Sequence, residues 1–158
     1  MQTPIDFTKQ LVKGRIAETV FSQMFRESGK YTVLEFGYEK IIPELVQAGQ
    51  TENSRIIETL RTAPDFAIIN NEMRRVRLVE VKYRRNLYTD EVLKIAQRMK
   101  NSWNPSYLFL CTLDGFYFGS VSKIIENSGT IARLSTDNIP QTTQNEYLGL
   151  LKDFERGK

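Results

Sequence analysis

The spacing of apolar residues predicts a long helix at the start of the chain, over residues 6–28. Apolar and small side chains recur at intervals of three and four residues from Phe7 to Phe25, which is the period of a helix that buries one face. Ser28 and Gly29 follow this stripe and form a suitable helix stop. The first element is therefore expected to pack along one side of a sheet.

The remainder of the chain predicts strands and two further helices. In chain order these are strands over residues 30–38, 64–70 and 75–85, a helix from the N-cap Thr89 to Asn104-Pro105, two strands within 106–121 that turn at Asp114-Gly115, and a terminal helix over 146–154. Residues 39–61 are ambiguous, with a short helix expected after Asn53-Ser54. The segment YLFLCTL is apolar on both faces, so we expect a central strand covered by helices. This order predicts an α/β fold with a mixed sheet flanked by helices.

Composition limits the chemistry that the chain can perform. Its 158 residues are expected to form one domain, and 41% hydrophobic with 26% charged residues is typical of a soluble globular protein. The chain has no histidine, which excludes Ser-His and Cys-His catalysis and the common zinc sites. Its one cysteine, Cys111, lies in an apolar run and is expected to be a buried hydrophobe. No apolar run could span a bilayer and the start resembles no targeting peptide, so we expect a cytoplasmic protein without membrane contact.

Positive charge is concentrated in one segment. The net charge is only +3, but six of the twelve residues from Arg74 to Arg85 are basic, against a single acid, Glu80. Two interpretations stay open at this point: a solvated edge strand protected by charge, or a surface that contacts phosphates.

The predicted hairpin brings two acids together. If the chain turns about residues 72 and 73, the numbers of paired residues sum to 145, which matches apolar with apolar positions along both strands. Asp65 then faces Glu80 with their Cβ atoms about 5 Å apart. Two carboxylates at that distance repel by roughly 3 kcal/mol at an effective dielectric constant near 20. Asp65 could instead simply form a Pro-Asp turn at the strand entry.

A third acid lies on the apolar stripe of the first helix. An isolated charge at Glu18 would be costly, so it must pair with a neighbour such as Arg15, reach solvent, or join a functional cluster. We expect this helix to pack on the hairpin face that carries Val76, Leu78 and Glu80. Lys82 on the same face would supply one compensating charge, and a divalent cation such as Mg²⁺, which prefers oxygen ligands, would supply two.

Pro64-Asp65, followed after fourteen residues by Glu80-Val81-Lys82, resembles the PD-(D/E)xK signature of the restriction-endonuclease-like nuclease superfamily. The helix with GRIAE, which places Glu18 ahead of the first strand, resembles an extra acidic motif of the Holliday-junction-resolvase-like branch. The αβββαβ order of that core matches the predicted order over about residues 7–121. Residues 122–158 lie outside it as a C-terminal helical extension.

The resemblance implies a role for each matching position. Asp65 and Glu80 would bind Mg²⁺, or Mn²⁺ in its place, with the carbonyl of Val81 as a further ligand. Glu18 would bind the same ion through water or help to hold a second one. Lys82 would orient or activate the attacking water and stabilise the charge that develops on the phosphate, which agrees with what phosphodiester hydrolysis requires without histidine.

The resemblance also suggests contacts with nucleic acid. Tyr83, Arg84 and Arg85 follow the motif and would sit at the rim of the cleft, where they could hold phosphates or stack on a base. Gln97 matches a glutamine of some branches, although those branches place a tyrosine where this chain has Asn101, and a solvated helix position is its alternative.

These observations predict a magnesium-dependent endonuclease that acts on nucleic acid, with DNA expected. The first alternative is a non-catalytic nucleic-acid-binding or assembly subunit that keeps the fold, and the second is a structural protein whose motif is coincidence. A domain of this size holds one active site, so cleavage of both strands would favour a homodimer.

Overall fold

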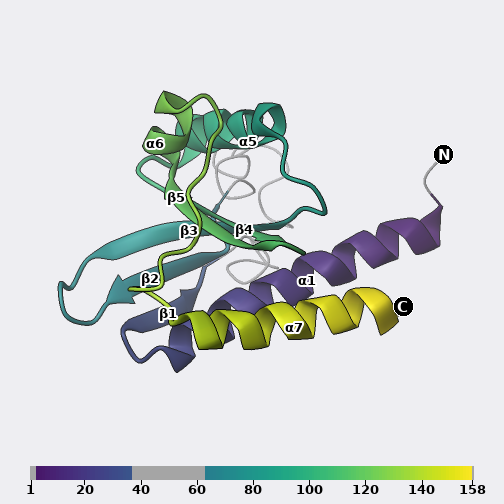
Figure 1. Cartoon of the computed structure of the whole chain (residues 1–158). Coiled ribbons are helices and arrows are strands. Elements are labelled where there is room, and N and C mark those ends of the chain that lie inside the picture. The colour runs from purple at the N-terminus through teal and green to yellow at the C-terminus, as the bar shows by residue number, and fades with distance from the viewer. Residues whose placement is uncertain (1–2, 37–62, 158) are drawn as a thin grey trace, which may run out of the picture.

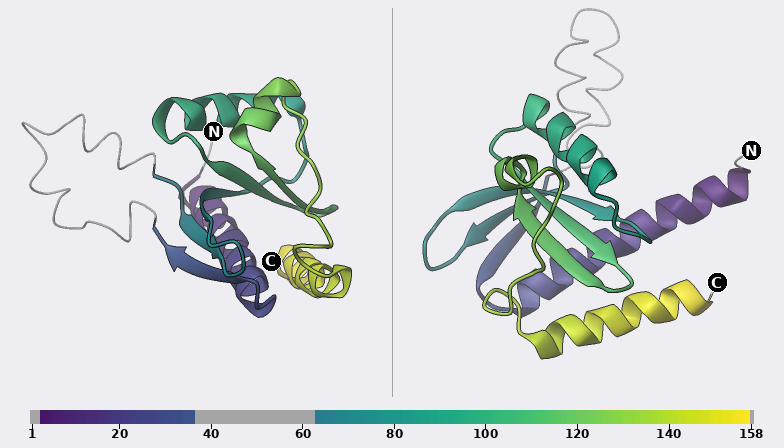
Figure 2. Two further views of the ribbon diagram at one scale, coloured as in Figure 1. Left: turned by 90° about the vertical axis from the view of Figure 1, so that its left-hand side faces the viewer. Right: turned by 45° about the horizontal axis from the view of Figure 1, so that its top comes forward.

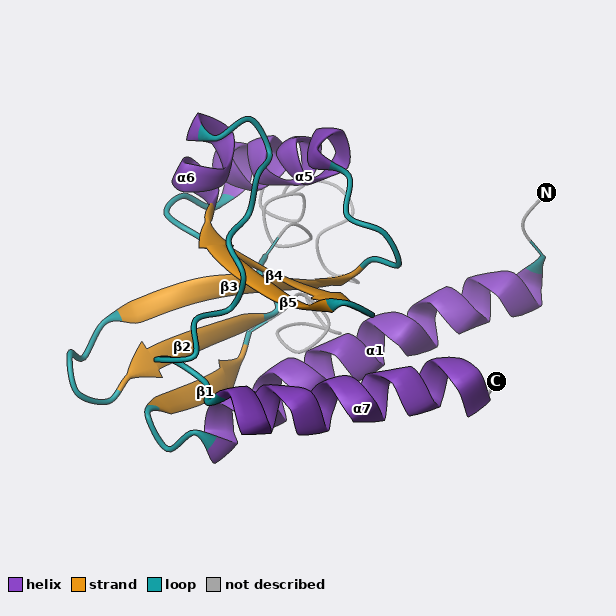
Figure 3. Cartoon of the chain, in the orientation of Figure 1, coloured by secondary structure: helices purple, strands orange, loops and turns teal. Residues whose placement is uncertain are grey.

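A computed structural model describes residues 3–36 and 63–157 of the chain. The described elements form one five-stranded sheet with helices on both sides (Figures 1 and 3). The strands are β1 (Tyr31–Glu35), β2 (Phe66–Asn70), β3 (Val76–Tyr83), β4 (Tyr107–Thr112) and β5 (Gly115–Ser120), and the helices are α1 (Pro4–Glu27), α5 (Thr89–Ser102), α6 (Val121–Glu126) and α7 (Gln141–Gly157). Their order contains the expected αβββαβ sequence, and the mixed α/β fold is confirmed.

The strands lie in the order β1-β2-β3-β4-β5, with β3 in the middle. All neighbours are antiparallel except β3 and β4, which are parallel and are connected through α5. The central position of β3 contradicts the interpretation of its basic residues as protection of an edge strand. Instead, Arg77 lies over the ring of Tyr107 on β4, 4.9 Å from its centre.

Two of the described helices cover each face of the sheet. Figure 2 shows α1 and α7 on one side, and α5 and α6 on the other. Each side has its own buried apolar cluster: the α1 side includes Phe21, Phe109 and Leu151 of α7, and the α5 side includes Ile95 and Leu108. None of the described helices is long and apolar enough to cross a membrane.

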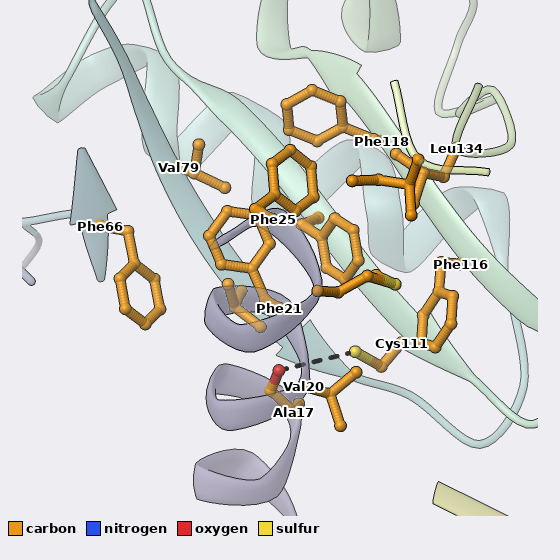
Figure 4. Packing of buried hydrophobic residues seen from close by; sticks show 14 of the residues in the cluster. Ala17, Val20, Phe21, Phe25, Phe66, Val79, Cys111, Phe116, Phe118 and Leu134 are labelled. Atoms are coloured by element: carbon orange, nitrogen blue, oxygen red, sulfur yellow. Dashed lines mark hydrogen bonds between the residues drawn. The ribbon is translucent and has the colours of Figure 1, made fainter. Parts of the chain in front are cut away.

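Aromatic rings fill the space between α1 and the sheet (Figure 4). Phe21 and Phe25 of α1 are fully buried, and the ring of Phe21 lies edge-on to Phe109 of β4 with 4.9 Å between ring centres. The thiol of Cys111 donates a weak hydrogen bond to the carbonyl of Ala17 in the same cluster. Cys111 is fully buried, as expected, and burial raises the pKa of its thiol. These contacts fix α1 across β3 and β4.

Only the second half of α1 is buried in this way. Thr3 and Asp6 form a reciprocal capping box at its start, but Phe7 and Leu11 are 55% and 49% exposed. Figure 1 shows why: the first half of α1 projects beyond the sheet, next to the end of α7. The spacing of apolar residues therefore correctly predicts the helix α1, but the predicted burial of its first two turns is wrong.

The predicted hairpin register is confirmed. Ile69 pairs with Val76 and Ala67 with Leu78, so paired residue numbers sum to 145. The turn is stabilised by the side chain of Asn70, which accepts backbone N–H bonds from residues 72 and 73. The β2–β3 ladder ends at the pair of residues 66 and 79, whereas β3 continues alongside β4 to residue 83.

The predicted inner face of β3 is wrong. Val79 and Val81 pack in the cluster beneath α1, whereas Val76 is 64% exposed. Side chains alternate along a strand, so Glu80 and Lys82 lie on the opposite face, the one that α5 and α6 cover. In agreement with this, Glu80 and Lys82 pair with Leu108 and Leu110, which belong to the buried cluster on the α5 side. The prediction that α1 packs on the Glu80 face of β3 is therefore wrong.

Three further differences concern the helices. Thr89 is the first residue of α5, and Tyr88 is its N-cap, without a side-chain capping bond. The sequence did not predict α6, whose N-cap is Ser120, and α7 is longer than the predicted terminal helix. The short helix expected after Asn53-Ser54 lies outside the described residues.

Candidate active site

A pocket of about 300 Å³ opens beside the start of β2, where the β2–β3 ladder stops and β3 continues alongside β4. Three parts of the chain contribute to it: the middle of α1, the residue before β2, and the last residues of β3 with one that follows. The lining residues are Gln10, Lys13, Gly14, Glu18, Asp65, Glu80, Val81, Lys82, Tyr83 and Arg84. The pocket therefore brings together all four residues that the sequence predicts as catalytic.

The position of Asp65 follows from the end of the hairpin ladder. It lies in a bend directly before β2, and one of its carboxylate oxygens accepts the backbone N–H of Val81 at 2.8 Å. Val81 lies beyond the last paired residues of β2 and β3. The side chain of Asp65 thus takes the place of a missing backbone partner and is fixed at the edge of β3.

The surroundings of Asp65 oppose its negative charge. Burial, followed by the charges of Glu80 and Glu18, raises the pKa of Asp65 to about 8 against an ordinary value of 3.8, although the Val81 N–H and Lys82 act in the opposite direction. In the protein alone these surroundings therefore disfavour the ionised form of the Asp65 carboxyl group. The pocket has a shortage of positive charge close to Asp65.

Lys82 compensates part of the acidic charge. Its ammonium group lies 3.0 Å from a carboxylate oxygen of Glu80, and both side chains are partly exposed to the pocket. Residues 80 and 82 are two apart on one strand, so alternation places them on the same face. A Glu-x-Lys motif on a strand produces this ion pair without any tertiary constraint.

Glu18 approaches the same pocket from α1. It is half-buried one turn after Gly14, and its charge contributes to the raised pKa of Asp65. Because the β2–β3 ladder is open here, acids from the two faces of the sheet line one pocket. The part of the chain that the structure describes nevertheless contains no group of three or more His, Cys, Asp or Glu side chains arranged to hold a metal ion.

The predicted nucleic-acid-binding residues lie in different environments. Tyr83 lines the pocket, and its hydroxyl donates to Glu155 of α7 at 3.2 Å. Burial and the nearby Glu155 raise the pKa of Tyr83 to about 12. Arg84 also lines the pocket and pairs with Glu91 at the start of α5.

Arg85 and Gln97 are not among the lining residues. Arg85 is exposed beyond the end of β3, where its charge partly offsets the rise in the pKa of Tyr83. Gln97 is exposed on α5, which agrees with its alternative as a solvated helix position. The structure does not bring Gln97 into the pocket.

Sequence reasoning missed three residues that line the pocket and one, Glu155, that contacts its lining residues. Gln10 and Gly14 precede Glu18 by eight and four residues, so helical spacing would have placed them on the same face, and Lys13 is their neighbour. Glu155, which contacts both Lys13 and Tyr83, has no such signal, because its position depends on the packing of α7 against α1.

Fold and pocket together define an α/β protein whose five-stranded mixed sheet opens onto an acidic pocket with a lysine. No protein-family model and no curated protein sequence matches the chain. Among solved structures, it is similar to Hjc, a Holliday junction resolvase of the archaeon Archaeoglobus fulgidus, with 14% identity and a TM-score of 0.43 over 81% of this chain and 93% of that one. With identity and TM-score this low, the match tells nothing about the activity of this chain.

Proposed function

We propose that the chain is a metal-dependent nuclease that hydrolyses phosphodiester bonds in nucleic acid, with DNA as the expected substrate. The observation that carries this proposal is the pocket in which Asp65, Glu80 and Lys82 meet Glu18. The raised pKa of Asp65 supports it, because perturbed carboxylates in an open pocket are typical of functional sites.

The residues of the pocket fit a hard divalent cation such as Mg²⁺ or Mn²⁺. Carboxylate and carbonyl oxygens are the ligands that such ions prefer, and Asp65, Glu80 and the carbonyl of Val81 would supply them. Glu18 would contribute through water or hold a second ion. The raised pKa of Asp65, caused first by burial and then by the charge of Glu80, is consistent with a site that a cation would neutralise, although the described acids are not arranged as a complete ligand set.

When bound, the cation would supply positive charge at the phosphoryl oxygens and lower the pKa of a water molecule. The protein's own residues would do the remainder. Lys82 would exchange Glu80 for the phosphate, stabilise the charge that develops there and orient the attacking water. Asp65, fixed by the N–H of Val81, would keep the acidic side of the pocket in a single position relative to Lys82.

The alternative is a non-catalytic nucleic-acid-binding or assembly subunit with the same fold. The Lys82–Glu80 ion pair favours this alternative, because in the free protein it occupies the ammonium group and the carboxylate that the proposed catalysis would use. Against it, three acids beside a phosphate site would weaken binding to a polyanion unless a cation intervenes.

Cleavage assays decide between these functions. Plasmid, linear duplex, single-stranded and four-way-junction DNA would be incubated with Mg²⁺ or Mn²⁺. We expect Asp65→Asn and Lys82→Ala to lower the cleavage rate by about 100-fold or more, while Asp153→Asn, which removes an exposed charge from α7, leaves the rate unchanged. Equal turnover by wild type and both site variants would refute the enzyme hypothesis.

Several finer points stay predictions. These are the choice of DNA over RNA, the identity of the metal, a homodimer for cleavage of both strands, a cytoplasmic location and a single domain over residues 1–158. A panel of substrates, metals and sedimentation measurements would test the first three.

A further inference from the structure

The C-terminal helix reaches the edge of the candidate active site. Glu155 of α7 accepts a hydrogen bond from the ammonium group of Lys13 at 3.2 Å and another from the hydroxyl of Tyr83 at 3.2 Å. The ammonium group of Lys13 also lies 5.6 Å from the centre of the Tyr83 ring. A carboxylate from the end of the chain thus joins two residues that line the acidic pocket.

Lys13 stands between two hollows. On one side it lines the acidic pocket, and on the other it lines an apolar hollow of about 380 Å³ between α1 and α7, together with Val12, Phe154 and Glu155. Its side chain is 24% exposed. Lys13 therefore forms part of the wall of both hollows and is partly open to solvent.

Among the described residues, each cation that lines the pocket has a carboxylate partner. Lys82 pairs with Glu80, Arg84 with Glu91 and Lys13 with Glu155. A phosphate that enters the pocket must replace or share such a partner, and Glu155 is the one that comes from α7. The two hydrogen bonds and the charge of Lys13 lower the pKa of Glu155 despite its partial burial, so it carries a full negative charge at neutral pH.

The two donors that hold Glu155 are also suitable donors for a phosphate oxygen. An ammonium group and a phenolic hydroxyl bind phosphate in the same way as they bind a carboxylate. Partly exposed ion pairs contribute little to stability and exchange readily. The arrangement of Lys13, Tyr83 and Glu155 is therefore that of an anion site filled by the protein's own carboxylate.

We propose that Lys13 and Tyr83 bind a backbone phosphate of the nucleic acid and that Glu155 competes with this phosphate for them. The inference rests on the proposed function, since the ligand is the expected substrate. It gives the C-terminal extension a role: α7 carries an internal competitor that weakens binding. Lys13 is a substrate-binding residue in this scheme, and Glu155 is its counter-ion in the free protein.

The test compares charge removal at two positions of α7. Glu155→Gln keeps an oxygen that can accept the Tyr83 hydroxyl, and Asp153→Asn removes the same charge from an exposed position two residues earlier. Binding of a fluorescein-labelled duplex and a labelled four-way junction would be followed by fluorescence anisotropy in EDTA, which prevents cleavage. Circular dichroism and thermal unfolding would verify that each variant is folded.

We expect Glu155→Gln to lower Kd by about 3- to 10-fold, and Asp153→Asn to change it by less than about 2-fold because an exposed charge is screened. In the background of Lys13→Met, the Glu155→Gln substitution should no longer tighten binding. The slope of log Kd against log salt concentration should also increase by about 1 in Glu155→Gln, since Lys13 would then release a solution anion instead of Glu155.

Several results would overturn this inference. If Glu155 only fastens α7 to α1, Glu155→Gln will leave binding unchanged or weaken it. Equal tightening by Asp153→Asn, or tightening that persists with Lys13→Met, would show a general charge effect instead of competition. These outcomes leave the proposed function intact. If neither the wild type nor the variants bind either DNA, this inference is overturned as well, and the cleavage assays with Mg²⁺ or Mn²⁺ decide separately on the proposed function.

Discussion

Replacement of Asp65 by asparagine should stabilise the protein at alkaline pH. In the folded state the pKa of Asp65 is raised to about 8, first by burial and then by Glu80 and Glu18, against an ordinary value of 3.8. An asparagine oxygen can still accept the N–H of Val81, so Asp65→Asn removes the charge and keeps the hydrogen bond. The substitution therefore isolates the cost of the negative charge.

The sign and size of the effect follow from proton linkage. A raised pKa means that the folded protein binds the proton more tightly than the unfolded chain does. Below about pH 4 the wild type is thus not destabilised by a charge on Asp65. It loses stability as the pH rises, until Asp65 ionises near pH 8. Each pH unit in that window removes up to about 1.4 kcal/mol. Between about pH 5 and pH 8.5 we expect the wild type to lose about 2 to 4 kcal/mol relative to Asp65→Asn.

Urea denaturation in EDTA at about pH 5 and pH 8.5 measures this difference. The free energy of unfolding of Asp65→Asn should exceed that of the wild type clearly at the higher pH and much less at the lower pH. Asp153→Asn, a substitution of an exposed carboxylate on α7, should follow the wild type at both. Parallel loss of stability by wild type and Asp65→Asn between the two pH values would refute the description of this pocket as short of positive charge.

Two further predictions concern the cation and the fold. Above its Kd, Mg²⁺ should raise the thermal stability of the wild type in proportion to the logarithm of the Mg²⁺ concentration, and more at about pH 8 than at pH 6. It should leave the stability of Asp65→Asn unaffected. Thermal unfolding in Ca²⁺-free buffers with added Mg²⁺ measures this, and equal shifts in both proteins would contradict it. Gly129→Ala should cost about 2 kcal/mol or more, because Gly129 has a φ of +97° and an added Cβ would lie 2.1 Å from the carbonyl oxygen of Thr89. Gly149→Ala on α7, where an added Cβ meets nothing within 4 Å, should instead stabilise the protein by about 0.5 to 1 kcal/mol. A loss of stability in Gly129→Ala of only a few tenths of a kcal/mol would contradict this account.

The hairpin could be predicted from the sequence because its information is local. Matching apolar positions set the register of β2 and β3. Asp65 and Glu80 directly adjoin the last pair of this ladder, Phe66 with Val79, and both line the pocket. The Glu-x-Lys spacing likewise fixes the ion pair of Glu80 with Lys82 by strand alternation alone. These parts of the site need no knowledge of how distant elements pack.

The parts that could not be predicted depend on the extent of the sheet and on which face each helix covers. Helical periodicity shows that α1 has an apolar stripe but not where the sheet beneath it ends, so the exposure of Phe7 and Leu11 was missed. Apolar residues occur on both faces of β3, and the sequence does not say that Val79 and Val81 meet α1 while Val76 lies in solvent. The contact of Glu155 with Lys13 requires the path of the chain after β5, which carries no local signal.

The end of the β2–β3 ladder explains why acids from both faces of the sheet can share one pocket. Beyond Phe66 and Val79, β3 keeps β4 as a neighbour but loses β2, and Asp65 occupies the opening through its bond to Val81. That bond alone does not account for an aspartate, since asparagine would make it without the cost that the raised pKa records. The divalent cation that we propose beside Lys82 would require negative charge at position 65, and it would therefore account for the aspartate.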